Sequence, residues 1–172
     1  MSMPGSRNVR RKLENAFSES RVNSTLPYPI SDNLVKLVID TSIGVKAILQ
    51  EYNSSKALQL RDDFRHGIHQ LFAPDLYFLE IGNVLVMAAR NGKISATDLP
   101  LFYGDLIRHQ PIILPFTSLF PRAFSIASQI RVSVYDATYL ALSEREGCPL
   151  LTEDVKLINA AQGFSTITLD SL

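Results

Sequence analysis

The sequence has few of the features that mark an extracellular or membrane protein. Its 172 residues include one cysteine, Cys148, and no tryptophan. A single cysteine cannot form an internal disulfide, which favours a reducing cytoplasm over an oxidising compartment. No apolar run approaches the roughly 20 residues that a membrane-spanning helix needs. Residues 10–29 are polar where a signal peptide requires an apolar segment. We therefore expect a cytoplasmic protein with no membrane partner.

The sequence also lacks a net charge, because Lys plus Arg equals Asp plus Glu at 17 each. No global basic field therefore exists to attract a nucleic acid. Residues 1–33 carry five bases and three acids, which leaves 12 bases and 14 acids, a net charge of −2, for the rest of the chain. In an enzyme that approaches phosphates, an acidic balance is reasonable mainly when divalent cations occupy some of the carboxylates.

Glycine-rich phosphate loops are missing as well. Neither G-x-x-x-x-G-K-[ST] nor G-x-G-x-x-G occurs, so the sequence gives no support for nucleotide-cofactor chemistry.

The chain divides into a polar N-terminal part and one α/β domain. Residues 1–33 offer little apolar surface, and we predict a flexible or peripheral extension with at most a short helix over residues 10–20. Residues 34–172 alternate short β-rich runs with helix-period segments, which is typical of a parallel sheet flanked by helices. Strands are predicted at 35–40, 70–73, 112–114, 150–152 and 166–169. Helices are predicted at 43–52, 55–65, 96–109, 118–130, 136–146 and 155–161, and a further helix is predicted after Pro74 with a stop at Asn91-Gly92.

Asp40 is the first carboxylate that calls for an explanation. It ends the apolar run 35–39, which places it at the carboxyl end of a predicted central strand. Ligands of open α/β sheets bind at such ends. Capping of the following helix explains the same position equally well.

Glu80 lies on the helix after Pro74. The apolar residues of this helix are spaced for one face, and they are Leu76, Leu79, Val84, Met87 and Ala88. Glu80 shares that face, and so does Asn83, a candidate supporting residue. A buried ionised carboxylate is costly unless it is paired or bound to a metal. The alternative is a salt bridge or a position at the edge of the apolar stripe.

Asp136 and Asp154 both lie where a helix is predicted to begin. Ser133 and Asp136 fit a capping box, and Asp154 follows Thr152 at the change from strand to helix. Capping alone would explain each of them.

The four acids together point to a metal site. Asp40, Asp136 and Asp154 lie at strand ends or helix starts on one edge of the predicted sheet, and Glu80 projects inward from a packed helix. Such carboxylates cannot crowd together while ionised unless a positive charge compensates them. Oxygen-only ligation favours Mg²⁺, or alternatively Mn²⁺, over zinc, which would recruit His or Cys.

The ordered set of segments 37–42, 74–85, 134–143 and 150–157 resembles the PIN domain family, in particular the small toxin ribonucleases of VapBC-type toxin–antitoxin systems. The resemblance covers residues 34–172. It implies a PIN-like fold, Mg²⁺-dependent endoribonuclease activity on RNA, a cognate antitoxin and a homodimer. Asp40, Glu80 and Asp136 match the acids that bind metal in the family, Asp154 matches a more variable fourth acid, and Thr152 matches a nearby hydroxyl residue. Residues 1–33 depart from the family pattern, in which the first strand begins close to the initiator methionine.

Two other functions fit part of this pattern. A catalytically inactive PIN-like module would bind RNA or protein without cleaving it, and metal-dependent cleavage separates it from a nuclease. In a phosphoaspartate enzyme the strand-end carboxylate is itself the nucleophile. Such sites usually need a second Asp two residues on, and Ser42 occupies that position.

Overall fold

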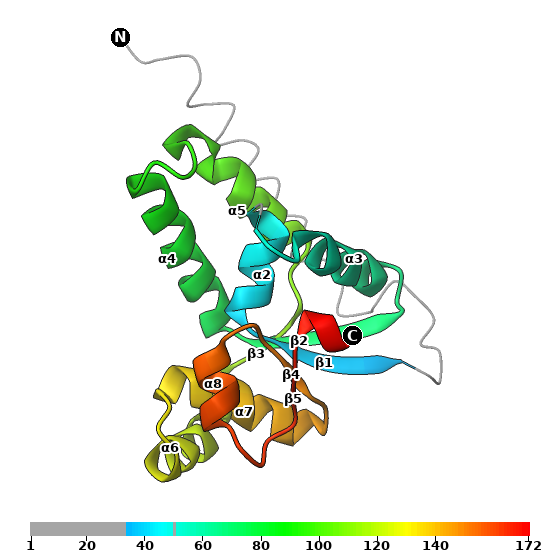
Figure 1. The fold of residues 1–172 in the computed structure, drawn as a ribbon, viewed down its shortest axis with the longest axis vertical. Helices are drawn as coiled ribbons and strands as arrows, with labels where there is room; N and C mark the ends of the chain where they lie inside the picture. Colours follow the sequence, from blue (N-terminus) through cyan, green and yellow to red (C-terminus); the bar gives the residue numbers. More distant parts are fainter. Residues whose placement is uncertain (1–33, 50) are drawn as a thin grey trace.

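Five short parallel strands form the centre of the molecule, in the order β3-β2-β1-β4-β5 (Figure 1). The computed structural model describes residues 34–49 and 51–172, so the predicted extension 1–33 lies outside the described residues. The strands are β1 (Val35–Ile39), β2 (His69–Pro74), β3 (Ile112–Leu114), β4 (Leu150–Leu151) and β5 (Thr166–Ile167). The predicted α/β class and the sheet of five parallel strands are confirmed.

Helices cover both faces of this sheet. They are α2 (Thr41–Ile48), α3 (Ser54–Arg65), α4 (Leu76–Arg90), α5 (Leu99–Arg108), α6 (Phe120–Gln129), α7 (Val134–Glu146) and α8 (Val155–Ala160). In Figure 1, α2 to α5 lie on one side of the sheet and α6 to α8 on the other. None of the helices in the described ranges is both long and apolar enough to cross a membrane.

The core lies between the sheet and these helices. Val38, Leu150 and Leu151 have no exposed surface, because β1 and β4 are covered on both faces. Helix α7 is buried over residues 137–143 without a break, since it packs between the sheet and α6. Polar side chains that α7 carries inward therefore need hydrogen-bond partners inside the protein.

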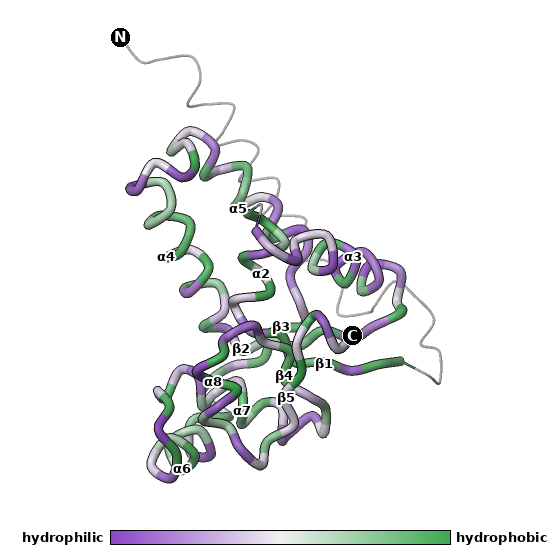
Figure 2. Tube along the Cα trace, in the orientation of Figure 1, coloured by the Kyte–Doolittle hydropathy of each residue, from purple (hydrophilic) through white to green (hydrophobic). Residues whose placement is uncertain are grey.

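Helix α4 turns a different face to the core than its sequence predicts. Leu76 and Ala88 are buried as expected, but Leu79 is 77% exposed and Met87 is 43% exposed. The buried face instead contains Leu76, Tyr77, Ile81, Leu85 and Ala88. The prediction for Leu79 and Met87 is wrong because α4 is hydrophobic along most of its length (Figure 2), so periodicity alone does not fix which face is inward.

Candidate active site

Asp40 is held at the carboxyl end of β1 by backbone and side-chain hydrogen bonds. Its N–H donates to the carbonyl oxygen of Leu151 on β4 at 3.0 Å. Its Oδ1 accepts from the Thr41 N–H at 2.7 Å, which makes Asp40 the N-cap of α2. Its Oδ2 accepts from the hydroxyls of Ser42 at 2.8 Å and Thr152 at 2.7 Å. Asp40 is therefore a helix cap and also lies at the sheet edge where ligands bind.

The two hydroxyls that serve Asp40 have fixed donor directions. Thr152, with no exposed surface, accepts from the Asp154 N–H at 3.0 Å. Ser42 accepts from the Glu153 N–H at 3.0 Å. Because each hydroxyl oxygen accepts a hydrogen bond from a backbone N–H, its own proton is directed to the Asp40 carboxylate. Burial raises the pKa of Asp40, and these hydrogen bonds oppose the rise.

Glu80 is half-buried near the start of α4, at the edge of the apolar face. Its Oε2 accepts from the Thr41 hydroxyl at 2.8 Å and from the Tyr139 hydroxyl at 2.5 Å. Burial raises the pKa of Glu80, the two hydroxyls lower it, and the negative charges of Asp40 and Asp136 raise it further. Glu80 thus lies within electrostatic range of both Asp40 and Asp136.

Asp136 and Asp154 have the capping roles that their positions allow. Asp136 forms a capping box with Ser133, and its Oδ2 accepts from the Ser133 hydroxyl at 2.8 Å. Asp154 is exposed and caps α8, with its Oδ1 accepting from the N–H groups of Lys156 at 2.8 Å and Leu157 at 3.2 Å. In the described part of the chain, the second carboxylate oxygen of each has no hydrogen-bond partner.

The structure brings the predicted acids to one edge of the sheet with different degrees of contact. Glu80 lies within range of the charges of Asp40 and Asp136, and the Asp154 N–H is joined to Asp40 through Thr152. Asn83 is exposed and makes no side-chain hydrogen bond to another described residue. Its supporting role stays a prediction.

The chemistry of the donors suits a hard divalent cation, because all are oxygens. Within residues 34–49 and 51–172, however, no three Asp, Glu, His or Cys side chains approach closely enough to form a metal site as they stand. One oxygen of Asp136 and one of Asp154 are engaged in capping bonds at the start of their own helices.

Three site residues were not singled out from the sequence: Thr41, Ser42 and Tyr139. The first two follow Asp40 directly, so their hydroxyls are close to it for local reasons. Tyr139 lies one turn after Asp136 on the buried helix α7 and is 1% exposed. A buried phenol normally finds a hydrogen-bond partner, and this was the available signal.

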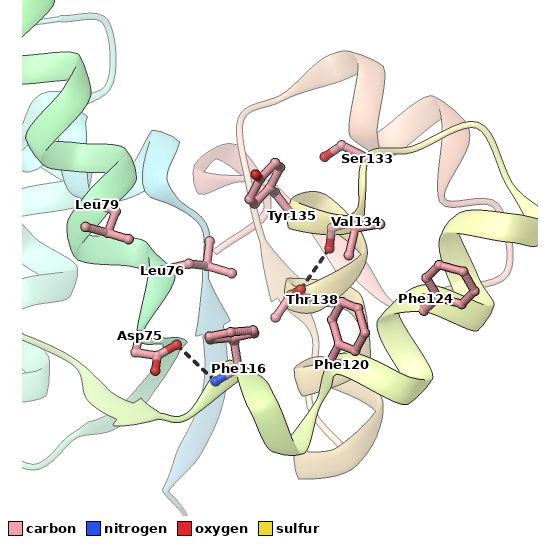
Figure 3. A pocket seen from close by; sticks show the side chains of 10 residues that line it. All are labelled: Asp75, Leu76, Leu79, Phe116, Phe120, Phe124, Ser133, Val134, Tyr135 and Thr138. Atoms are coloured by element: carbon pink, nitrogen blue, oxygen red, sulfur yellow. Dashed lines mark hydrogen bonds between the residues drawn. The ribbon is translucent and has the colours of Figure 1, made fainter.

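Figure 3 shows the side chains that line a largely apolar groove. It encloses about 760 Å³ between the start of α4, the α6 region and the start of α7, and its apolar lining includes Leu79, Phe116, Phe120, Phe124 and Tyr135. The side chains of these five residues are all at least 41% exposed. Asp75 shapes one wall, since its Oδ1 accepts from the Phe116 N–H at 2.9 Å. Leu79 and Tyr135 directly precede Glu80 and Asp136.

The chain is similar in sequence to known proteins. The sequence model of the PIN domain matches residues 37–163. Ribonuclease VapC9 of Mycobacterium tuberculosis is 30% identical over 133 residues, which cover 77% of this chain and 97% of that protein.

Solved structures share the fold at lower sequence identity. VapBC2 from Rickettsia felis, bound to a DNA fragment from their promoter, aligns with a TM-score of 0.56 and 12% identity, covering 78% of this chain and 98% of that one. M. tuberculosis VapC20, described as a Sarcin-Ricin loop cleaving toxin, aligns with a TM-score of 0.53 and 15% identity, covering 74% and 95%. Together with the parallel sheet and the acids at its edge, these matches show that the chain belongs to the PIN domain family and to its VapC-type members.

Proposed function

We propose that this protein is a Mg²⁺-dependent endoribonuclease that hydrolyses RNA phosphodiester bonds, with Asp40, Glu80, Asp136 and Asp154 holding the metal. The observation that carries the proposal is the placement of Asp40 at the carboxyl edge of the sheet with Glu80 beside it, where the hydroxyl of Thr41, the residue after Asp40, donates to Glu80. The ribonuclease names of relatives with 30% identity support the same activity.

Each acid would hold the metal from a different element. Asp40, fixed by three donors, would bind it from the end of β1, and Glu80 and Asp136 would contribute oxygens from α4 and α7. Asp154 would complete the set from the start of α8. When bound, Mg²⁺ (Mn²⁺ can replace it) lowers the pKa of a coordinated water and offsets the charge of the scissile phosphate.

Water rather than the ribose 2′-hydroxyl is the nucleophile in this proposal. Two features of the chain suit a reaction that depends on a cation and on carboxylates that accept protons. The four acids carry only negative charge, so they need the cation before a phosphate can approach. The partners of Asp40 and Glu80 are hydroxyls and an N–H that donate to them, so these carboxylates are placed to accept rather than to give protons.

The biological setting we propose is that of a type II toxin. A solved neighbour is described as a toxin, and another is the two-protein VapBC2 assembly, which supports a cognate antitoxin partner. Because the proposed substrate is RNA, we propose that the protein acts in the cytoplasm. We also propose a homodimer, and the exposed aromatic side chains of Phe116, Phe120 and Phe124 along the groove support it.

Incubation of purified protein with total RNA tests this function. We expect discrete cleavage with Mg²⁺, none with EDTA, and none for Asp40→Asn. Asp62→Asn on α3 is the matched control, because it makes the same charge change outside the site and should cleave as the unaltered protein does. Binding of Mg²⁺ or RNA without cleavage of any RNA in the mixture would favour the inactive binding module instead.

A further inference from the structure

Three oxygens from three different helices meet at Glu80. The Thr41 hydroxyl at the start of α2 and the Tyr139 hydroxyl on α7 both contact Glu80 Oε2 on α4, and the two hydroxyl oxygens lie 2.9 Å apart. Tyr139 is 1% exposed, so water does not compete for this contact.

The hydroxyl protons restrict which oxygen of Glu80 is available. Each hydroxyl has one proton, so either both donate to Oε2, or one hydroxyl donates to the other, which in turn donates to Oε2. In every arrangement Oε2 accepts from at least one protein hydroxyl. Oε1 makes no hydrogen bond with any described residue and remains available to an outside ligand.

The contact also connects Glu80 with the segments that carry Asp40 and Asp136. Thr41 directly follows Asp40, and Tyr139 lies three residues after Asp136 on the same helix. Through Thr41 and Tyr139, the position of Glu80 is therefore tied to both other carboxylates. Hydrogen bonds from neighbouring groups to ligating carboxylates commonly orient them for the metal.

We propose that Tyr139 and Thr41 are positioning residues that hold Glu80 through Oε2 and present Oε1 to the divalent cation. This inference rests on the proposed function, since it assigns the roles of two further residues to the same metal site. Neither residue is proposed to touch RNA or the metal.

The binding of Mn²⁺ to the full-length protein tests the proposal. Calorimetry and the electron paramagnetic resonance signal of free Mn²⁺ both measure this binding. Tyr139→Phe removes only the hydroxyl and keeps the ring. We expect it to weaken Mn²⁺ binding by roughly 10- to 100-fold, the range typical for loss of a partner that orients a ligand. Tyr103→Phe on α5 makes the same chemical change elsewhere and should bind Mn²⁺ as the unaltered protein does. The Mg²⁺ concentration for half-maximal RNA cleavage should rise by a similar factor for Tyr139→Phe.

A second variant keeps the test decisive if Tyr139→Phe folds poorly. Thr41→Val removes the other hydroxyl while leaving the Thr41 N–H bond to Asp40 in place. We expect it to weaken Mn²⁺ binding too, and the double variant to lose less than the sum of both effects, because both hydroxyls serve one oxygen.

The outcomes separate this proposal from the proposed function. Mn²⁺ affinity that is unchanged in both variants, beside metal-dependent cleavage by the unaltered protein, would overturn the positioning roles alone. Failure of the unaltered protein both to bind Mn²⁺ and to cleave RNA would overturn the metal site, and the positioning roles with it.

Discussion

At the scale of single residues, the site depends on hydroxyl groups as much as on carboxylates. Asp40 has two hydroxyl donors and Glu80 has two hydroxyl neighbours, and the hydroxyls of Ser42 and Thr152 are oriented by backbone N–H groups. These contacts keep charged side chains in place inside the protein, where an unpaired carboxylate would be costly.

Thr152→Val tests this point, because valine has nearly the same shape but no hydroxyl. The change leaves Asp40 without one donor and the Asp154 N–H without its acceptor. We expect a loss of about 1–3 kcal/mol in the free energy of unfolding, measured by urea denaturation in EDTA.

Thr138→Val is the matched control for that experiment. Thr138 is also buried, but its hydroxyl donates only to the Val134 carbonyl oxygen of its own helix. Such a bond adds little to stability, so little change is expected. Equal losses for the two variants would contradict a special role for Thr152.

At the scale of elements, close packing of α2 against α4 sets the distance between Asp40 and Glu80. Gly44 of α2 faces Tyr77 and Ile81 of α4, and a Cβ built at Gly44 would lie 2.6 Å from Ile81 Cδ1 and closer still to the Tyr77 hydroxyl oxygen. Only glycine lets the two helices approach this closely.

Gly44→Ala should therefore push α4 away from α2. We expect a loss of about 1–3 kcal/mol in unfolding free energy from overpacking, together with weaker Mn²⁺ binding because Glu80 moves relative to Asp40. Urea denaturation and calorimetry measure the two effects.

Gly82→Ala on α4 is the comparison, because a Cβ there would meet nothing within 4 Å. Alanine is the better helix former by up to about 1 kcal/mol, so this variant should be as stable as the unaltered protein or more so, with unchanged Mn²⁺ binding. A Gly44→Ala protein that matched it in both measurements would contradict the packing argument.

The same elements show what the sequence can predict and where it stops. Strand and helix order, the strand-end position of Asp40 and the capping box of Ser133 and Asp136 are local features, and the structure confirms them. The inward face of α4 was predicted wrongly because the helix itself is hydrophobic along most of its length. The Tyr139–Glu80 contact joins residues that are 59 positions apart in the sequence. No spacing rule predicts which distant residue a buried phenol will contact.

At the scale of the whole molecule, the exposed groove predicts self-association. Phe124 is 60% exposed at its rim and Leu101 on α5, outside the groove, is 70% exposed. Sedimentation should show a dimer for the unaltered protein and for Leu101→Glu, and a monomer for Phe124→Glu, because burying a new charge in an apolar interface is costly. A monomer in all three would refute the proposed dimer, and a Phe124→Glu dimer would place its interface elsewhere.

We propose that the protein as a whole hydrolyses RNA with a water molecule that a cation activates at these carboxylates. Chemical analysis of the ends of cleaved RNA tests it most directly. Attack by water leaves a 5′-phosphate and a 3′-hydroxyl, and we expect these ends at every site of Mg²⁺-dependent cleavage. A 2′,3′-cyclic phosphate with a 5′-hydroxyl would mean that the ribose hydroxyl attacked, and it would contradict the proposed chemistry.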